Sequence, residues 1–482
     1  MKKRLIFGAF IAFSLASCTS PSISNNGTSS FEDSSTVSSS ETIITKEFDD
    51  ENIVMTAAVI SDPHVGFKDA KVDNNVTFRN TLDALKRLNG DKDFDVLLSA
   101  GDNTQNGTKE EVNQFMDIYK STYDINKTPL FFCHGNHDTY WSGCMSTTGF
   151  YDAYGEDVYK NDLDQTAAKL GNRHMKVNGI HLVAVQMSTY QPGNNTFTPQ
   201  TETWVKETLD AIKLENPLQP VIVLGHSPVS NTVHGSFDEN DTGNWGSSKQ
   251  LGTLLSDYPN VILLSGHTHY DFYHSKSISQ DKFTAIQIPS SSDLDLDNNY
   301  SDQVKDLANR REYSFGAILE VDNLGNIRFT RYDLKKEEKI LNSWVIPSPK
   351  QDNSHLDKYN LQIREANNLA PNFEGKNITL TYDSENHFSL SFDVPTDDDV
   401  ILAYKVRIYI GSEEDIYDSE DYIEEFVYLD DYYNYPQGKQ KVDLEIDGVY
   451  SRRSQWTVKL AAVDCFNKQS EFVTNTELID LA

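Results

Sequence analysis

The stretch Val261–Tyr270, VILLSGHTHY, joins an apolar run to a pair of histidines. The run ends at Gly266, and His267 and His269 follow with one threonine between them. In an extended chain, residues two positions apart point to the same side. The stretch therefore predicts a buried strand whose end delivers two imidazole groups to one place.

Other apolar runs also end in side chains that can bind a metal or transfer a proton. These ends are Asp62 and His64 after VMTAAVIS, Asp102 and Asn103 after FDVLLSAG, Asn136, His137 and Asp138 after PLFFCHG, and His226 after VIVLG. Segments with helical periodicity separate the runs, at 77–88, 108–120 and 201–214. Strands that alternate with helices predict an α/β layered fold, in which ligands bind beyond the carboxyl ends of the strands. We therefore expect these clusters to meet at one edge.

Two local patterns add detail to this prediction. Thr108 is followed by Glu111 at the start of the second helical segment, which is a capping-box pattern. The segment HMKVNGIHLVAVQ predicts a hairpin that turns at Asn178 and Gly179.

The composition limits the classes of protein to which the chain can belong. Its 482 residues are too many for one ordinary domain and suggest two or three. With 42 Lys and Arg against 73 Asp and Glu, the formal net charge is −31. The chain lacks the basic surface that sequence-independent nucleic-acid binding needs, and we predict no sequence-specific binding either. An anionic substrate must therefore be attracted by a local positive site.

The strand ends supply enough donors for two metal ions. The donor set is Asp62, His64, Asp102, Asn136, His226, His267 and His269. If one carboxylate bridges, each ion receives four protein ligands. Mixed imidazole and oxygen donors suit Zn, Fe or Mn better than calcium. Two such ions about 3.5–4 Å apart can bind phosphate oxygens and convert a shared water to hydroxide. Their charge would exceed that of the carboxylates and the hydroxide, which provides the positive site that an acidic chain requires.

Five motifs carry a resemblance to a known family. D-x-H at Asp62, GDN at Gly101, GNHD at Gly135, GH at Gly225 and GHTH at Gly266 resemble those of calcineurin-like metallophosphoesterases, in the family's order. The resemblance covers residues 55 to about 334 and implies a β-sandwich core flanked by helices, with a dinuclear metal centre.

The resemblance also implies a role for each site residue. One metal would be held by Asp62, His64, Asp102 and His269, and the other by Asp102, Asn136, His226 and His267. His137 is implied to bind the substrate phosphate and to protonate the leaving group, and Asn103 is expected to contact substrate. Gln105 stands where purple acid phosphatases have a tyrosine, so iron–tyrosinate chemistry is not expected. GDNTQNGTKEE is instead similar to the branch that contains class III cyclic-nucleotide phosphodiesterases.

Each of these residues alone has an ordinary explanation, because single Asp, Asn and His side chains commonly form turns or helix caps. Only the combined set predicts a site. Asp138 is expected to orient His137 or to cap the next segment. Cys133 is expected to be buried, with a Cys133–Cys144 disulfide as the alternative. The histidines that match no family position are expected to be ordinary, although the first and fourth could line the pocket: His134, His174, His181, His234 and His274.

The N-terminal segment predicts export. Residues 1–17 have a basic start and an apolar run too short to span a membrane, which is typical of a signal peptide. Leu15–Cys18 resembles a bacterial lipobox and implies lipid attachment at Cys18. A simple signal peptide with a chance cysteine, or a short buried helix, is the alternative. Residues 18–48 are rich in Ser and Thr and predict a flexible spacer. The expected location is the bacterial cell membrane, at its extracytoplasmic face.

The sequence changes character after the catalytic domain, which is predicted at 50–340. Residues 341–365 indicate a linker or an extension packed on that domain. Residues 366–482 alternate as short strands and predict an all-β immunoglobulin-like sandwich that resembles fibronectin type III domains. The acidic, tyrosine-rich stretch Glu413–Tyr435 is interpreted as a solvated loop or, alternatively, as a surface for a partner.

Three functions are consistent with the sequence. The first is an exported phosphodiesterase in which a metal-bridging hydroxide attacks phosphorus. The second is a phosphomonoesterase or nucleotidase with the same centre. The third is an inactive binding or adhesion protein, against which the intact ligand set argues. The choice among Mn, Zn and Fe, and the natural substrate, are left open.

Overall fold

The computed structural model describes residues 47–140, 142–190, 194–237, 246–295, 311, 313–376, 378–382, 387–410, 422–427, 439–445 and 455–478. The predicted signal peptide, the lipidation residue Cys18 and most of the predicted spacer lie outside these residues. In the part of the chain that is described, no helix combines the length and apolar character needed to cross a membrane.

A seven-stranded sheet carries the first three motifs. Its strand order is β12 (Glu338–Lys339), β11 (Ile327–Asp333), β10 (Phe315–Asp322), β1 (Ile53–Ile60), β2 (Val96–Ser99) and β3 (Leu130–Phe132), and β13 (Trp344–Ile346) also pairs with β11. Strands β1, β2 and β3 are parallel, whereas β10 is antiparallel to β1. The carboxyl ends of β1–β3 therefore lie at one edge.

A six-stranded sheet carries the last two motifs. Its order is β4 (Arg173–Val177), β5 (Ile180–Ala184), β6 (Val221–Leu224), β7 (Val261–Ser265), β9 (Thr284–Gln287) and β8 (Ile278–Gln280). Strands β5, β6, β7 and β9 are parallel. The antiparallel β4–β5 hairpin turns at Asn178 and Gly179, as predicted.

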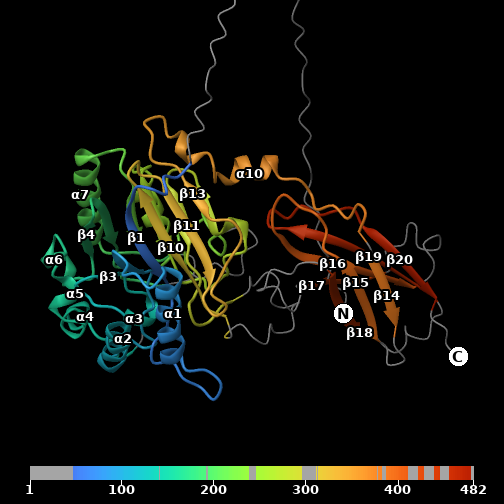
Figure 1. Cartoon of the computed structure of the whole chain (residues 1–482), viewed down its shortest axis with the longest axis horizontal. Coiled ribbons are helices and arrows are strands. Elements are labelled where there is room, and N and C mark those ends of the chain that lie inside the picture. The colour runs from blue at the N-terminus through green and yellow to red at the C-terminus, as the bar shows by residue number, and fades with distance from the viewer. Residues whose placement is uncertain are drawn as a thin grey trace, which may run out of the picture. The chain divides into compact units, whose positions relative to one another are not determined.

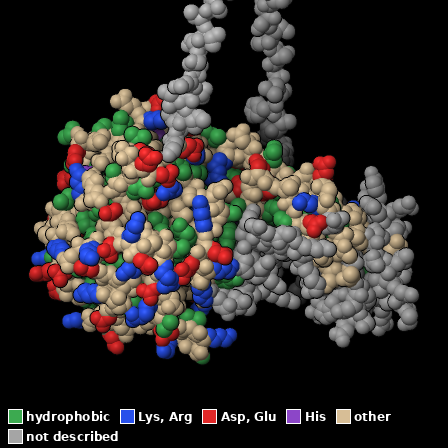
Figure 2. Space-filling model, viewed as in Figure 1, with side chains coloured by type: hydrophobic (Ala, Val, Ile, Leu, Met, Phe, Trp, Pro, Cys, Tyr) green, Lys and Arg blue, Asp and Glu red, His purple; other side chains and the backbone are tan. Residues whose placement is uncertain are grey.

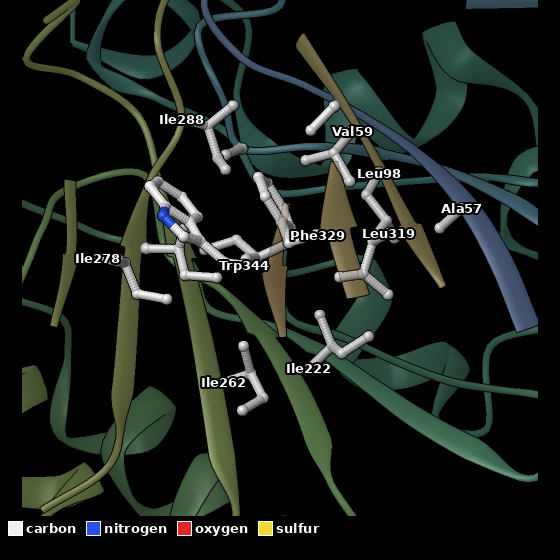
Figure 3. Close-up of a cluster of buried hydrophobic side chains, with 14 of the residues drawn as sticks. Ala57, Val59, Leu98, Ile222, Ile262, Ile278, Ile288, Leu319, Phe329 and Trp344 are labelled. Carbon is white, nitrogen blue, oxygen red and sulfur yellow. The ribbon is translucent and has the colours of Figure 1, made fainter. Parts of the chain in front are cut away.

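The two sheets pack face to face over a hydrophobic core (Figure 3). Val59 and Leu98 from the first sheet lie in one cluster with Ile222 and Ile262 from the second. Interior parallel strands are covered on both faces, which explains why their sequences are continuous apolar runs. By the area rule, complete burial of each such side chain stabilises the fold by about 1.5–3 kcal/mol.

Helices cover the outer faces of both sheets (Figure 1). On the first sheet, α1 (Asn74–Leu88) and α2 (Lys109–Thr122) pack against Ala58 and Leu97. On the second sheet, α7 (Pro199–Glu215) and α8 (Lys249–Leu255) pack against Val223 and Leu263. The fold is therefore a helix-flanked β-sandwich, and this confirms the predicted fold class.

Local sequence signals account for the helix boundaries. The predicted capping box of α2 is present, since Thr108 Oγ1 accepts from Glu111 N and the Glu111 carboxylate accepts from Thr108 N. The prediction for α1 began three residues late, because Asp73 caps the helix by accepting from Asn75 N.

The observed strand β3 is shorter than the strand predicted from PLFFCHGNHD. Strand β3 ends at Phe132, and Asn136–Thr139 forms a helical turn, α3. The Asp138 carboxylate accepts from Gly135 N at 2.9 Å and from Asn103 N at 3.1 Å, which fixes this turn beside the end of β2. Short helices follow at α4 (Thr147–Tyr154), α5 (Glu156–Tyr159) and α6 (Gln165–Ala168).

The C-terminal region contains two further sheets. One has the order β14 (Ile378–Tyr382), β15 (His387–Asp393), β18 (Lys439–Glu445), and the other has the order β17 (Ile423–Val427), β16 (Ile401–Ile410), β19 (Gln455–Asp464), β20 (Val473–Leu478). Phe392, Val406 and Trp456 share a buried cluster, as in a β-sandwich. Its likeness to fibronectin type III domains stays a prediction.

The predicted domain boundaries also stay predictions. Within 341–365, β13 belongs to the first sheet and α10 (Leu361–Asn367) begins. Through β13, this segment is joined to the first sheet, as expected for an extension packed on the catalytic domain rather than for a free linker. Of the acidic, tyrosine-rich stretch, only Tyr422–Val427 is described. On the face shown in Figure 2, described acidic and basic side chains are interspersed.

Candidate metal centre

Loops from both sheets bring the predicted donors together. Donor atoms of Asp62, His64, Asp102 and His269 all lie within 4.8 Å of one another, and so do those of Asp102, His226 and His267. Asp102 belongs to both groups. The sequence prediction that this carboxylate bridges is consistent with this arrangement, although the roles as ligands stay predictions.

The first group joins residues that are far apart in sequence. His269 Nε2 lies 3.2 Å from Asp62 Oδ1 and 3.2 Å from His64 Nε2. His64 Nε2 is also 3.9 Å from Asp102 Oδ2. Asp62 and Asp102 are almost fully buried, so bulk water does not solvate either carboxylate.

The second group includes the predicted amide donor. His226 Nε2 lies 3.2 Å from Asp102 Oδ2 and 3.1 Å from Asn136 Oδ1. The rings of His226 and His267 are 5.1 Å apart between centroids. His226 Nδ1 faces the carbonyl oxygen of Ala100 at 2.8 Å, and because a carbonyl only accepts, Nδ1 carries the proton. His226 therefore directs Nε2 at Asp102 and Asn136.

Five of the predicted ligands adopt left-handed backbone conformations. Their φ angles are 49° for Asp62, 44° for His64, 47° for Asp102, 75° for His267 and 59° for His269. Such conformations cost on the order of 1–3 kcal/mol each outside glycine and concentrate at functional sites. Backbone hydrogen bonds between the loops hold them in place: Asp62 N donates to Gly101 O at 3.0 Å, and His64 N donates to Asp102 O at 3.1 Å.

Two motif glycines permit the close approach of these loops. A Cβ atom at Gly135 would collide with Asp102 Oδ1 and would come within 2.5 Å of Asp102 N. A Cβ atom at Gly266 would collide with Ser61 Oγ and Asp62 Oδ2. The glycines in GNHD and GHTH are therefore required by the packing of one motif on another.

Charge in the cluster is balanced between carboxylates and imidazoles. Burial raises the pKa of a carboxyl group, but His269 and His226 lower the pKa of Asp62 to about 2. Burial is likewise outweighed at Asp102, where His226 holds the pKa well below its usual range. Burial lowers the pKa of His64 to about 3. It is outweighed by Asp102 at His226 and by Asp62 at His269, so that both pKa values rise to about 9.

These residues fit a pair of metal ions. His64 Nε2 and His269 Nε2 face each other at 3.2 Å, and both are near carboxylate oxygens. His64 Nδ1 is buried and has no hydrogen-bond partner. No hydrogen bond at Nδ1 therefore determines which ring nitrogen of His64 carries the proton. Convergent imidazole nitrogen and carboxylate oxygen atoms are the donors that transition ions bind. This Asp/His cluster fits the expected dinuclear centre and does not identify the metal.

A serine loop that the sequence analysis missed supports the first group. Ser290 Oγ and Ser292 Oγ donate to Asp62 O at 2.8 and 3.0 Å. Asn74 Nδ2 donates to His64 O at 3.3 Å and to Ser292 Oγ at 3.2 Å. The serines follow β9, so the rule that pointed to the other strand ends could have found them. The sequence analysis did not select these serines, because it looked for typical metal donors and hydroxyl groups are not among them.

His137 lies beside both groups. Its backbone N–H donates to Asp102 Oδ1 at 2.7 Å, and its ring is 4.5 Å from that of His64, edge to face. His137 Nδ1 is 2.9 Å from Gln105 O, so Nδ1 donates and Nε2 is the atom that can exchange a proton.

Asn103 makes contacts that differ from the expected contact with substrate. The residue is fully buried, its Oδ1 accepts from Ser99 Oγ at 2.6 Å, and its Nδ2 donates to Cys133 O at 3.0 Å. These bonds connect the ends of β2 and β3. The described contacts give Asn103 a part in positioning the loops, and its expected contact with substrate stays a prediction.

Asp138, His134 and His234, which the sequence analysis also singled out, contact neighbouring side chains or backbone groups. Asp138 accepts from Gly135 N, and burial raises its pKa to about 6. His134 Nδ1 pairs with Gln186 Oε1 at 2.8 Å, and His234 stacks on His274 at 3.7 Å between centroids. The alternative of a Cys133–Cys144 disulfide is wrong, because both cysteines are free, and Cys133 is buried as expected.

The comparison with protein families identifies the class of domain that carries this site. Residues 55–271 match the family model described as calcineurin-like phosphoesterase, so the chain carries a domain of this family. The predicted family and the predicted class of enzyme, a metal-dependent phosphoester hydrolase acting on a phosphate ester, are confirmed.

The comparisons also identify individual relatives. The chain is 27% identical over 229 residues to the 3′,5′-cyclic adenosine monophosphate phosphodiesterase CpdA of Haemophilus influenzae, and the match spans 46% of this chain and 72% of that protein. Among solved structures, a phosphopantetheinyl hydrolase from Mycobacterium tuberculosis is 14% identical, with a TM-score of 0.30 over 49% of this chain and 89% of that one. A 5′-nucleotidase precursor from Thermus thermophilus is 12% identical, with a TM-score of 0.32 over 60% of this chain and 54% of that one.

Proposed function

We propose that this protein is an exported phosphodiesterase that uses two metal ions. The observation that carries the proposal is Asp102, whose carboxylate belongs to both groups of donor atoms. If the carboxylate were shared by two ions, both would be within reach of one phosphate group. The similarity to a relative named as a cyclic-nucleotide phosphodiesterase favours a diester over a monoester.

The proposed ligands are those predicted from the motifs. Asp62, His64, Asp102 and His269 would hold one ion, and Asp102, Asn136, His226 and His267 would hold the other. When bound, such a pair would supply Lewis-acid activation of the phosphoryl group and of the attacking water. The buried carboxylates and the left-handed loops keep the donors in place before substrate arrives, so little reorganisation is needed.

His137 is the proposed acid for the leaving group. Its Nδ1–H donates to Gln105 O, which orients the ring, and its backbone N–H donates to Asp102 Oδ1, which anchors the residue beside the carboxylate. The Nε2 atom would donate a hydrogen bond to the phosphate and then transfer the proton to the departing oxygen.

Export and anchoring rest on the N-terminal sequence. We propose that residues 1–17 are removed, that lipid is attached at Cys18, and that the enzyme works at the extracytoplasmic face of a bacterial membrane. Labelled palmitate should enter the expressed full-length chain and be lost in Cys18→Ser. Equal labelling of both proteins would contradict the proposal.

The activity is tested by comparing a chromogenic diester with its monoester. Bis(p-nitrophenyl) phosphate and p-nitrophenyl phosphate would be offered to a chain lacking residues 1–17, with Mn, Zn or Fe supplied separately. A diester rate well above the monoester rate, abolished in His226→Ala, is the expected result. A dominant monoester rate would favour a phosphomonoesterase, and no metal-dependent turnover of either ester would contradict the proposed function.

A further inference from the structure

The carboxylate of Glu111 makes more hydrogen bonds than the cap of a helix requires. The side chain is buried and accepts from Thr108 N at 3.1 Å, which completes the capping box of α2. It also accepts from Asn106 N at 2.9 Å and from Asn106 Nδ2 at 2.8 Å. Glu111 therefore binds the loop that joins the GDN motif to α2 as well as the end of the helix.

One peptide group of this loop joins Glu111 to His137. The peptide between Gln105 and Asn106 donates its N–H to Glu111 Oε2 at 2.9 Å. The carbonyl oxygen of the same peptide accepts from His137 Nδ1 at 2.9 Å. A trans peptide is planar, so its N–H and C=O groups point in opposite directions. Binding of the N–H to the carboxylate therefore directs the carbonyl oxygen at the imidazole.

Two glycines allow Glu111 and this loop to lie against the motifs. A Cβ atom at Gly66 would come within 2.5 Å of Glu111 Cγ, and Gly66 is two residues after His64. A Cβ atom at Gly107 would collide with Asp138 O, in the turn α3. Glu111 is thus packed on the loop after β1, and the loop that it holds is packed on α3.

The negative charge of Glu111 affects the peptide as well as its position. Both carboxylate oxygens accept from nitrogen donors, as in an ionised carboxylate. Hydrogen bonds to ionised groups are roughly twice as strong as those between neutral groups, and linked hydrogen bonds polarise one another. The Gln105 carbonyl is therefore a stronger acceptor for His137 Nδ1–H than an unassisted carbonyl would be, and it stabilises the ring more when Nε2 also carries a proton.

We propose that Glu111 is a positioning residue for His137, and that it acts through the Gln105–Asn106 peptide as the carboxylate partner of the imidazole. The inference rests on the proposed function, in which His137 protonates the leaving group. It gives Glu111 a role in the reaction in addition to capping α2. That role is greatest where the leaving oxygen is strongly basic and most needs a proton.

The test compares two diesters that differ only in the leaving group. Methyl p-nitrophenyl phosphate releases a weakly basic phenolate, whereas methyl phenyl phosphate releases a more basic one that depends more on protonation. Glu111→Gln keeps the shape of the side chain and leaves a single acceptor oxygen. We expect kcat/KM to fall roughly tenfold for the phenyl ester and less than about threefold for the p-nitrophenyl ester.

The ratio of the two rates separates positioning from a merely structural effect. Both rates are measured on one protein preparation, so a loss of folded protein or of bound metal would lower both. Asn106→Ala changes an exposed side chain and removes one of the hydrogen bonds to Glu111, so it should shift the ratio in the same direction by less. Thr108→Val is the matched control, because it removes the hydroxyl that caps α2 and keeps the bonds between Asn106 and Glu111. It should leave the ratio unchanged.

His137→Asn is the reference variant, because it removes the proposed acid and should shift the ratio at least as far as Glu111→Gln. An unchanged ratio in Glu111→Gln, with a shifted ratio in His137→Asn, would overturn the inference. An equal loss on both esters in Glu111→Gln, or an equal shift in Thr108→Val, would also overturn it. Failure of the proposed function would differ, because the unmodified enzyme would then hydrolyse neither ester, or His137→Asn would leave the ratio unchanged.

Discussion

The two ends of the second sheet both use left-handed backbone. At the amino end of β5, the hairpin turn has φ values of 48° at Asn178 and 94° at Gly179. At the carboxyl end, His267 and His269 have φ values of 75° and 59°. Gly adopts this conformation without a steric cost, whereas a residue with a side chain, such as His, pays roughly 1–2 kcal/mol. Strain is thus retained where donors must converge.

A histidine pair also lies on the β4–β5 hairpin, and its surroundings differ from those of the histidines in the candidate metal centre. His174 Nε2 lies 2.9 Å from His181 Nδ1, and burial lowers the pKa of both rings. Burial acts in the same direction on His226, but the carboxylates of Asp102 and Asp62 raise its pKa to about 9. The buried carboxylates, rather than the histidines, therefore distinguish the candidate metal centre from an ordinary histidine pair.

The largest effect is expected from Asp102→Asn, which keeps the shape of the side chain and removes the charge shared by both groups. We expect metal-dependent turnover to fall by more than about 100-fold, because even residues that only support metal ligands change affinity or activity by 10–100-fold. Bound metal, measured by elemental analysis, should fall below that of the unmodified protein. His181→Gln, at the other end, should change neither quantity. Full metal content in Asp102→Asn would contradict a bridging role.

The next effect compares a glycine in the candidate metal centre with a glycine in the β4–β5 hairpin turn. Gly135→Ala forces a methyl group into Asp102, and overpacking of this kind costs about 1–3 kcal/mol and displaces the carboxylate. Gly179→Ala meets only Gln219 Nε2 at 3.9 Å, so its cost of about 1–2 kcal/mol is that of the left-handed backbone.

Equilibrium urea unfolding and metal titration separate these two cases. Both glycine variants should lose stability, whereas only Gly135→Ala should also lose metal affinity. Normal metal affinity in Gly135→Ala would show that the close approach of GNHD to Asp102 is not required for the centre.

A smaller effect is expected from the serine loop. The double variant Ser290→Ala/Ser292→Ala removes both hydroxyl donors to Asp62 O, which help to hold its left-handed conformation. Metal affinity should fall roughly 10-fold, since supporting residues orient ligands. Ser470→Ala is a matched control, because it removes a buried hydroxyl that donates to Glu471 O at 2.9 Å. The control should leave metal affinity unchanged, and an equal change in both proteins would contradict a positioning role.

The smallest effect concerns the pair of His174 and His181 on the β4–β5 hairpin. Burial lowers the pKa of His174 from 6.5 to about 4. The unfolded chain therefore binds this proton first, so stability is complete above pH 6.5 and declines as the pH falls toward 4. Because the ring is partly exposed, we expect a loss on the order of 1 kcal/mol. Urea unfolding of the metal-free protein at about pH 7 and about pH 4.5 should show a smaller loss in His174→Asn. The same loss in both proteins would exclude the pair as its source.

Local sequence patterns were sufficient for much of the fold. The capping box at Thr108 and the turn at Asn178 and Gly179 were predicted correctly, because the atoms involved are close along the chain. The motif glycines and donors were also placed correctly at strand ends. The end of β3 was not, because the turn at Asn136–Thr139 depends on the Asp138 carboxylate, which accepts from Asn103 N in the loop after β2 and from Gly135 N.

The sequence by itself determined the buried strands, the polar residues at their ends and the family, since apolar periodicity and short motifs are local properties. Tertiary structure decided which donors meet: His64 and His269 are 205 residues apart, and Asp102 is shared only because loops from two sheets converge. It also turned Asn103 toward the β3 loop and placed Ser290 and Ser292 behind Asp62. These contacts depend on strand register and on the packing of one sheet against the other, which no short segment of sequence encodes.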